Sequence, residues 1–366
     1  MSRSTDMNIA VIGGGVFGAL AAIRLAEAGR KITLFERESD LLHGTSGVAN
    51  RVHLGYHYPR DERTACQCMK GYERFLVEFG EAVLERVQNA YFIARHGSLV
   101  TPEAYLAFCD SLGLQYRLLD PSRNRPPVQN VEMGILTNEA MFDPTVLRGL
   151  MSVRLRALDV DVRFNTEVVD IEPRDNGFEL TSGGSMKARY DGAVNCCYAD
   201  VNRLTERLGH PLPKHQYEYV AAPVVELDLD DVASLTVLDG HFGSLLPYGT
   251  SNRYLMFHVD HSVISRVDSD QLDPTWRNAA TAPFASLDKS QWLNDHIEAC
   301  GFFIPALREA RIRGVAQGVR MVLADHEQSD ARPSFITHHQ PGYVSVFAGK
   351  IDHAMWIADA VVGEYQ

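Results

Sequence analysis

The sequence has few cysteines, and none has the spacing of a disulfide framework or a metal-binding motif. The 366-residue chain holds six, with no CxxC pair, and Cys66 and Cys68 form a CxC instead. This scarcity argues against a disulfide-rich secreted domain and predicts reduced thiols and a cytoplasmic location. Blocks of Lys and Arg are also missing and the net charge is −12, so we do not expect a nucleic acid partner.

Long apolar runs are absent too. No stretch reaches the about 18 apolar residues that a membrane-spanning helix needs. The apolar run at positions 9–23 contains four glycines and follows no cationic leader, so we do not expect it to be a secretory signal. With 45% apolar and 22% charged residues, the composition is that of an ordinary globular protein with small-molecule ligands. The length favours two lobes.

The first forty residues have the pattern of a dinucleotide-binding unit. An apolar strand at positions 8–12 leads directly into Gly13-Gly14-Gly15-Val16-Phe17-Gly18, and small and apolar residues then recur at helical spacing as far as Gly29. A second strand at 31–35 ends at Glu36. A strand, glycine turn, helix, strand and acidic residue in this order make the motif specific.

Each part of this motif has a physical role. Gly13 permits a tight turn, Gly15 lets the backbone approach a pyrophosphate, and Gly18 allows close packing of the helix on the strand. The helix N-terminus offers free N–H groups to the phosphates. Glu36 can accept hydrogen bonds from a ribose diol and would repel a 2′-phosphate, which disfavours NADP.

Together with GTSGVANRVHLGYHYP at positions 44–59, this opening resembles the D-amino-acid oxidase family of FAD-dependent oxidoreductases, which includes glycine oxidase, sarcosine oxidase and 2-hydroxyglutarate dehydrogenase-like flavoproteins. Later stretches fit the same order. A helix from about 144 to 157 precedes paired strands within 160–170, and YDGAVNCCY at 190–198 departs from the family by placing Cys196, Cys197 and Tyr198 where small residues and a glycine stand. A strand at 342–348 and a final helix at 351–362 complete the match.

The resemblance implies FAD as cofactor and an α/β fold with an α+β second lobe. A Rossmann-type FAD-binding lobe would comprise 1–80, 137–210 and 318–366. A mostly antiparallel β-sheet lobe over the substrate would comprise 81–136 and 211–317. The implied cofactor contacts are Gly13, Gly15, Val16, Phe17, Gly18, Glu36, Arg37, Thr45, Ser46, Asn50, Arg51, Val168, Gly349, Lys350, Ile351, Asp352 and His353.

The segment HLGYHYPR at 53–60 crowds titratable and aromatic groups into an expected loop. By resemblance it crosses near the flavin ring, where polar side chains line a cavity. The resemblance leaves three alternatives open for His53: a covalent bond to the flavin, a non-covalent contact with it, or packing as a neutral imidazole. Tyr56, His57 and Tyr58 could shape the substrate pocket or relay a proton, or some could be surface residues. No carboxylate ligand or HExxH pattern supports a metal at the two histidines.

The substrate side offers several candidates. Arg320 stands where the family has the arginine of its GLRP segment, although Met321 replaces the proline, and a planar guanidinium suits a substrate carboxylate. Arg60 is a second clamp candidate, and Arg51 could meet either phosphate or substrate. His258 and His261 lie on an expected strand whose alternation could aim one of them into the cavity. The catalytic candidates are Arg320, His53, Tyr56, His57, Tyr248, His258 and Lys350.

These residues predict oxidation of the CH–NH bond of an amino acid or related amine, with a carboxylate-bearing amine as the expected substrate. Oxidation of a CH–OH group in a hydroxy acid or sugar-like substrate is the alternative, and a non-redox flavoenzyme or FAD-binding protein is the alternative of a different class. Flavin monooxygenases and halogenases are less favoured, because no GDAAH-like segment precedes the last helix.

Overall fold

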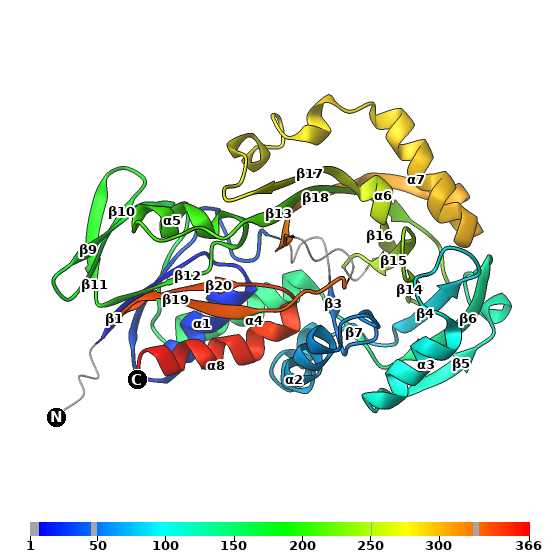
Figure 1. Cartoon of the computed structure of the whole chain (residues 1–366), viewed down its shortest axis with the longest axis horizontal. Helices are drawn as coiled ribbons and strands as arrows, with labels where there is room; N and C mark the ends of the chain where they lie inside the picture. The colour runs from blue at the N-terminus through cyan, green and yellow to red at the C-terminus, as the bar shows by residue number, and fades with distance from the viewer. Residues whose placement is uncertain (1–6, 45–49, 250, 325–328) are drawn as a thin grey trace.

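The computed structural model describes residues 7–44, 50–249, 251–324 and 329–366. Two large β-sheets dominate it (Figure 1). One has six strands in the order β19-β20-β12-β1-β2-β8, and the other has nine, running β17-β13-β16-β15-β14-β4-β6-β5 with β18 paired to β13. A three-stranded sheet, β11-β10-β9, and the short pair β3-β7 complete the strands. The expected fold class, a Rossmann-type lobe combined with a largely antiparallel sheet, is confirmed.

The elements have the following bounds. The helices are α1 (Val16–Glu27), α2 (Glu62–Phe79), α3 (Pro102–Ser111), α4 (Pro144–Ala157), α5 (Val201–Arg207), α6 (Val259–Ser262), α7 (Lys289–Phe303) and α8 (Ala354–Glu364). The strands of the six-stranded sheet are β1 (Asn8–Ile12), β2 (Lys31–Phe35), β8 (Asp161–Arg163), β12 (Gly192–Asn195), β19 (Phe335–Gln340) and β20 (Tyr343–Phe347). The small sheets contain β9 (Val168–Arg174), β10 (Gly177–Ser182), β11 (Met186–Tyr190), β3 (Arg51–Val52) and β7 (Ala140–Met141). The nine-stranded sheet contains β4 (Gln88–Ala94), β5 (Tyr116–Leu119), β6 (Val131–Thr137), β13 (His215–Glu226), β14 (Ala233–Leu238), β15 (Gly243–Pro247), β16 (Arg253–His258), β17 (Val263–Ser269) and β18 (Arg311–Leu323).

The six-stranded sheet is the middle of three layers. Strands β8, β2, β1, β12 and β20 are parallel, and β19 is antiparallel at the edge. Because successive side chains on a strand point to opposite faces, Ile9 and Val11 pack with helices α1, α4 and α8, whereas Ala10 and Ile12 pack against the three-stranded sheet. This double burial explains why β1 is apolar throughout.

The glycine turn after β1 closes as the motif predicts. Gly13 has φ +102°, which favours glycine, and a Cβ on Gly18 would overlap the carbonyl of Gly13. Gly15 precedes α1 without a side-chain cap, and a Cβ there would meet nothing within 4 Å. The helix therefore presents free N–H groups to open space.

The nine-stranded sheet arches over the other elements, with α7 on its outer side (Figure 1). Leu235 and Val237 of β14 pack in one cluster with Phe303 and Ile304 at the end of α7. Ser234 and Thr236, on the opposite face, accept hydrogen bonds from Arg51 of β3. The face away from α7 is therefore the one turned toward the segment at 50–58.

Three local expectations differ from the structure. The paired strands expected within 160–170 are not partners, because β8 pairs with β2 and β9 pairs with β10. The turn between β8 and β9, in which Asn165 has φ +51°, separates the two strands. His261 is not on a strand, since β16 ends at His258 and α6 follows. Strand β18 also runs continuously across the lobe boundary expected at 317/318, so we propose that boundary after Leu323.

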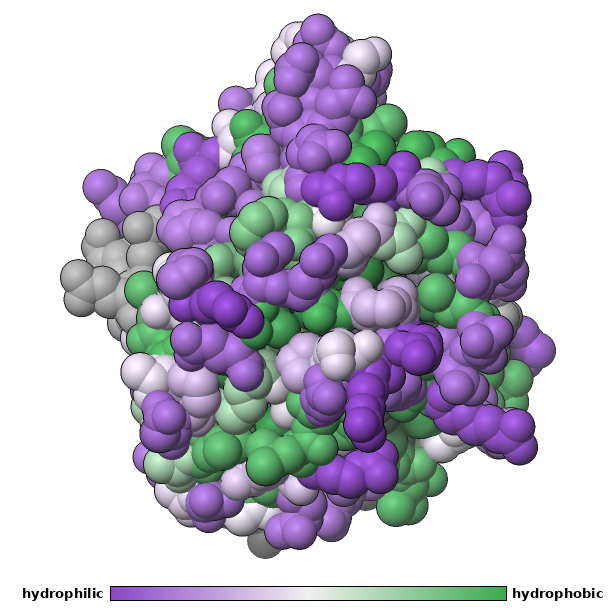
Figure 2. Space-filling view, turned by 90° about the vertical axis from the view of Figure 1, so that its right-hand side faces the viewer, coloured by the Kyte–Doolittle hydropathy of each residue, from purple (hydrophilic) through white to green (hydrophobic). Residues whose placement is uncertain are grey.

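Figure 2 shows the end of the molecule that lies on the right of Figure 1, where hydrophobic residues form separate patches among hydrophilic ones. In the part of the chain that the structure describes, every helix is too short or too polar to cross a membrane.

Candidate functional site

A cavity of about 350 Å³ opens beside the glycine turn. Its lining includes the expected cofactor residues Gly13, Gly15, Glu36, Arg37 and Val168. It also includes Gly44, directly before positions 45–49; the predicted contacts Thr45 and Ser46 lie outside the described residues. The cavity thus begins at the pyrophosphate position of the motif and extends to the acidic residue that ends β2.

The acidic residue is held in place by the turn. The Glu36 carboxylate accepts hydrogen bonds from the backbone N–H groups of Gly14 at 2.6 Å and Glu38 at 2.9 Å. Val16 and Gly18 are buried in α1, and Phe17 is partly buried on the same helix. Cys196 and Cys197, which replace the small residues of the family pattern, also line the cavity. A Cβ on Gly13 would meet the Cys196 carbonyl oxygen, so the turn still packs closely on this strand end.

Buried polar atoms without hydrogen-bond partners test whether this region fits a bound cofactor. Arg203 lines the cavity, and its buried Nε has no partner among the described residues. Near the predicted ring position, the same holds for both side-chain amide atoms of Asn50, for Nδ1 of His53 and His57, and for the Tyr58 hydroxyl. Buried polar atoms are rarely left unpaired in native proteins. The residues therefore fit FAD, which carries phosphate, ribose and ring heteroatoms to pair with them.

The crowded segment forms one aromatic cluster. The His53 ring lies 5.5 Å from the rings of His57 and Tyr58, and His57 lies 6.0 Å from Tyr91. Burial, reinforced by Lys350, lowers the pKa of His53 to about 4, and burial also lowers the pKa of His57 well below its usual value. Both rings are neutral at physiological pH and can accept a hydrogen bond.

Tyr56 occupies a different place from the one expected. Its side chain is fully buried, and its hydroxyl donates to the carbonyl of Gln115. Its own carbonyl accepts from the Tyr105 hydroxyl at 3.0 Å. The ring belongs to the core between α3 and the nine-stranded sheet, because Gly55, with φ +116°, turns the chain between His53 and Tyr56.

Arg51 links the short β3-β7 pair to the nine-stranded sheet. Its terminal nitrogens donate to the Tyr91 hydroxyl at 2.7 Å and to the hydroxyls of Ser234 and Thr236 at 2.8 Å each. Its Nε lies 3.7 Å from the fully buried carboxylate of Glu139. Arg51 is outside the cavity lining, and its terminal nitrogens are paired within the protein, while its buried Nε has no hydrogen-bond partner among the described residues.

Glu139 was not anticipated from the sequence. One oxygen accepts from the Leu54 N–H at 2.8 Å and lies 3.5 Å from His53 Nδ1, and the other accepts from the Tyr91 hydroxyl. Burial opposes its ionisation, but the pKa is held below the usual range because His53, Arg51 and Tyr91 outweigh that penalty. No local motif marks this residue, because its partners come from distant positions.

The turn before α8 carries the second part of the predicted ring site. Lys350 is mostly buried with its Nζ 5.0 Å from the Tyr58 ring centre, and burial, together with Arg332, lowers its pKa to about 8. Asp352 is fully buried and accepts from the His53 N–H at 3.0 Å. Burial raises the pKa of Asp352 to about 7. Gly349 and Ile351 flank Lys350 within the same turn.

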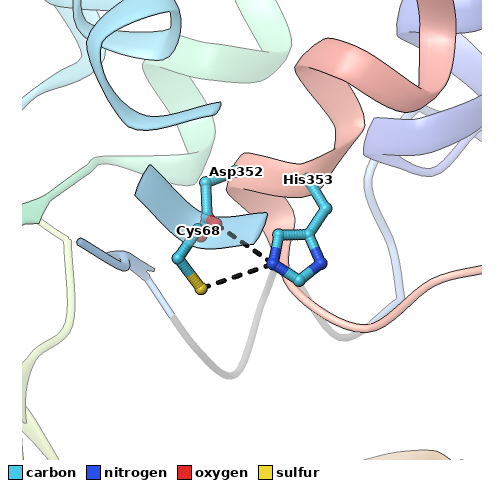
Figure 3. A group of neighbouring side chains, drawn as sticks. All are labelled: Cys68, Asp352 and His353. Carbon is cyan, nitrogen blue, oxygen red and sulfur yellow. Dashed lines mark hydrogen bonds and ion pairs between the residues drawn. The ribbon is translucent and has the colours of Figure 1, made fainter. Parts of the chain in front are cut away.

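Figure 3 shows Asp352 and His353 beside Cys68 of α2. Ser334 Oγ accepts from the Gly349 N–H at 2.7 Å, so we infer that its hydroxyl donates to His353 Nδ1 at 2.9 Å. That leaves the proton on Nε2, which faces Cys68 Sγ at 3.3 Å and an Asp352 oxygen at 3.6 Å. These three ligand-type atoms lie within 4.8 Å of one another, and in this tautomer the Nε2 proton points at the other two, so a metal would have to displace it. We therefore assign the group to hydrogen bonding.

Arg320 lies on the face of the sheet that is turned away from α7. On β13, Tyr217 and Tyr219 pack in the cluster with Trp276 and Trp292, while the alternate residue Glu218 meets Arg320 from the neighbouring strand. The fully buried Glu218 carboxylate accepts from Arg320 Nε and pairs with Arg266 at 3.1 Å. Among the described residues, the two terminal nitrogens of Arg320 have no hydrogen-bond acceptor. The contact at Nε therefore orients the guanidinium, while its two terminal nitrogens, here called the fork, remain open to a ligand.

The remaining substrate candidates differ in their pairing and in the face of the nine-stranded sheet on which they lie. Arg60 forms a two-point ion pair with Asp239, so its fork is already occupied. Tyr248 follows β15 and packs with the cluster that includes Phe257 on the inner face. The His258 ring lies 4.8 Å from that of His261 at a tilt of 41°, and the His261 ring lies 5.6 Å from that of His296 of α7. The expectation that one of these histidines points into the cavity is wrong, because strand alternation sends His258 to the α7 side.

Comparisons with known proteins agree with this geometry. The family model described as "FAD dependent oxidoreductase" (DAO) matches residues 8–358. The "FAD-dependent monooxygenase kojA" of Aspergillus flavus is 23% identical, covering 99% of this chain and 86% of its own length. Glycine oxidase from Geobacillus kaustophilus superimposes with a TM-score of 0.77 at 14% identity, covering 99% of this chain and 95% of that one.

A further solved structure is L-alpha-glycerophosphate oxidase from Mycoplasma pneumoniae with FAD bound, which has a TM-score of 0.74 and 16% identity and covers 98% of this chain and 94% of that one. At these identities the structures establish the fold, and the family model, spanning nearly the whole chain, establishes the family and its FAD cofactor. The chain is a member of the DAO family of FAD-dependent oxidoreductases.

Proposed function

We propose that this oxidoreductase oxidises the CH–NH bond of a small amine that carries a carboxylate. The observation that carries the proposal is the open fork of Arg320, which is fixed through its Nε by a buried Glu218 on the inner face of the sheet. Two parallel N–H donors in a rigid plane match the two oxygens of a carboxylate. Bound FAD supplies the acceptor for the hydride that leaves the substrate carbon.

Lys350 is the second element of the proposal. Its ammonium is near Tyr58, and its lowered pKa of about 8 lets it exchange a proton near neutral pH. A substrate amine must lose its extra proton before its carbon can release hydride, so a group that titrates in this range can accept that proton. Arg320 also places a permanent positive charge where an anionic substrate would bind, which favours a carboxylate over a neutral amine.

The first test is an anaerobic titration of the FAD-loaded protein. Amino acids, N-methylated amino acids, 2-hydroxy acids and glycerol phosphate are added in turn while the visible absorbance of the flavin is recorded. Bleaching by an amino acid supports the proposal. Bleaching by hydroxy acids or glycerol phosphate alone would establish CH–OH oxidation instead, the alternative that the glycerophosphate oxidase represents. The family is one of oxidoreductases, so we do not retain a non-redox role.

The second test examines the clamp. Arg320→Gln keeps an uncharged polar side chain but removes the guanidinium, so the Kd of the carboxylate substrate should rise about 30-fold to 100-fold. Arg313→Gln is the matched control, because Arg313 is on the same strand and pairs with Glu226 of β13 at 2.7 Å. An unchanged Kd in Arg320→Gln, or an equal rise in both variants, would remove Arg320 from the substrate site.

Monooxygenation is a second candidate because a relative whose match covers 99% of this chain is named a monooxygenase. That name argues against the sequence-based prediction that flavin monooxygenases are less favoured. The two reactions leave different products. Oxidation of the CH–NH bond yields an imine or its carbonyl hydrolysis product, whereas monooxygenation adds one oxygen atom from O₂ to the substrate. The product mass after aerobic turnover under ¹⁸O₂ separates them.

A further inference from the structure

The cavity beside the glycine turn has a second wall that the dinucleotide motif does not supply. This wall comes from the segment after β17, which contributes Leu272, Trp276, Arg277 and Ala279. Trp276 and Arg277 belong to a 3-10 turn at Pro274–Arg277. A part of the chain that extends from the nine-stranded sheet therefore reaches the cavity opposite the glycine turn.

The aromatic part of this wall is packed. Trp276 is 7% exposed and meets the Tyr219 ring edge to face, at 5.9 Å and 78°. The Tyr219 hydroxyl donates to the Gln317 side chain at 3.2 Å. Tyr219 and Gln317 line the same cavity. The turn is thus anchored to β13 and β18, and it holds an indole at a site where a flat aromatic ligand could pack.

Arg277 joins this wall to the opposite one. Its Nε and Nη2 donate to the two oxygens of Asp200 at 3.2 and 2.6 Å, and its Nη1 donates to Glu167 at 3.1 Å. Asp200 follows β12 and Glu167 precedes β9, so all three bonds cross the cavity rim. A two-point guanidinium–carboxylate contact is among the stronger polar contacts in proteins.

The ion pairs around the rim leave one buried donor of the described residues unused. Arg37 also pairs with Asp200 at 3.0 Å, and Arg203 pairs with Glu167 at 3.3 Å. Arg37 pairs with Glu38 as well, at 3.1 Å, so three guanidinium groups share three carboxylates. Arg203 Nε is buried without a hydrogen-bond partner in the described ranges. The rim therefore has an unused hydrogen-bond donor for the acceptor atoms of a phosphorylated adenosine.

We propose that Trp276 and Arg277 form a clasp over the adenosine half of bound FAD, and that the cofactor enters and leaves when the bonds of Arg277 to Asp200 and Glu167 open. The glycine turn and Glu36 hold one side of this half, and the clasp covers the other. Because the clasp contacts no part of the flavin ring, it selects for the adenosine diphosphate portion. The ion pairs are partly exposed, with the Arg277 side chain at 27% and Asp200 at 12%, so salt should weaken the closure.

The test uses the holoenzyme and the rate at which FAD is released, followed by the rise of free flavin fluorescence after dilution. Arg277→Gln should release FAD about tenfold faster than the parent at low salt. Raising the salt concentration should accelerate release from the parent and have less effect on the variant. Arg313→Gln, which removes an ion pair with Glu226 outside the cavity lining, should release FAD at the parental rate.

A second measurement locates the effect. ADP and FMN are titrated separately into the FAD-free full-length chain. The Kd of ADP should rise about tenfold in Arg277→Gln while that of FMN stays unchanged. Arg277→Lys keeps the positive charge but loses the planar guanidinium, so its Kd for ADP should lie between those of the parent and Arg277→Gln. This variant remains informative if Arg277→Gln does not fold.

Equal FAD release from parent and Arg277→Gln would overturn the clasp, as would a loss of FMN affinity as large as that of ADP. A salt-independent release rate in the parent would also overturn it. None of these readouts uses a substrate, so failure of the clasp leaves the proposed amine oxidation untouched, and the reverse also holds.

Discussion

Replacing Gly71 by alanine sets two physical effects against each other at the turn that carries Asp352. Gly71 is in the interior of α2, where alanine normally gains about 1 kcal/mol in helix propensity. Here the added Cβ would overlap the backbone carbonyl of Asp352. A carbonyl in a packed turn cannot rotate away as a flexible side chain can, and such overpacking costs about 1 to 3 kcal/mol or more. We expect the clash to prevail and to destabilise the chain by about 2 kcal/mol.

Gly149 provides the matched control. It lies in the interior of α4 with exposed surroundings, and a Cβ there would meet nothing within 4 Å. Gly149→Ala should therefore stabilise the chain by about 1 kcal/mol through propensity alone. With an unfolding entropy of about 2.1 cal/mol/K for each of the 366 residues, 1 kcal/mol corresponds to a Tm change of about 1.3 °C.

Differential scanning calorimetry of the holoenzymes should show a Tm about 1 °C higher for Gly149→Ala and about 2 to 3 °C lower for Gly71→Ala. FAD affinity should fall in Gly71→Ala, because the displaced turn includes Lys350 and Asp352. If Gly71→Ala raised the Tm as Gly149→Ala does, the close approach of α2 to this turn would be refuted.

Three further variants test the buried charges and a helix cap. Glu139→Gln leaves Arg51 without its buried counter-ion and should destabilise the chain by about 3 to 5 kcal/mol, measured by chemical denaturation; a loss under 1 kcal/mol would contradict the assignment. Burial raises the pKa of Asp352 from 3.8 to about 7, so between these pH values the folded chain binds more protons than the unfolded chain and its stability falls as pH rises. Asp352→Asn cannot ionise and so escapes this loss of stability, and the Tm of the variant minus that of the parent should increase from pH 4 to pH 8. A Tm difference that stays constant over this range would disprove the raised pKa of Asp352. Asp143→Ala removes the side-chain acceptor of the Thr145 and Val146 N–H groups at the start of α4 and should cost about 1 kcal/mol, whereas an unchanged Tm would show that water replaces the cap.

Some of the site could be read from the sequence because its signals are local. The glycine turn, α1, β2 and Glu36 lie within thirty consecutive residues, where backbone conformation and side-chain spacing follow from residue type. The cavity is lined by Gly13, Gly15 and Glu36 as the motif predicts. The roles we give to these residues in holding FAD stay predictions that the release and titration experiments test.

Other parts of the site could not be read in this way. Alternation along β16 predicted that His258 or His261 could face the substrate, but the strand ends at His258 and α7 covers the face to which that ring turns. Nothing near Glu139 or Arg277 marks them, since the partners of Arg277 are 77 and 110 residues away. Such pairings depend on which sheet face packs on which element.

The sequence by itself determined the dinucleotide turn, the two kinds of sheet and the family, because each rests on short-range patterns or on their order along the chain. The tertiary structure alone decided that Arg51 joins two sheets, that Tyr56 belongs to a core and that Arg277 reaches across the cavity. The physical reason is that the partner of a side chain is set by the packing of segments that come together only on folding. The residue type at one position does not specify which distant segment that will be.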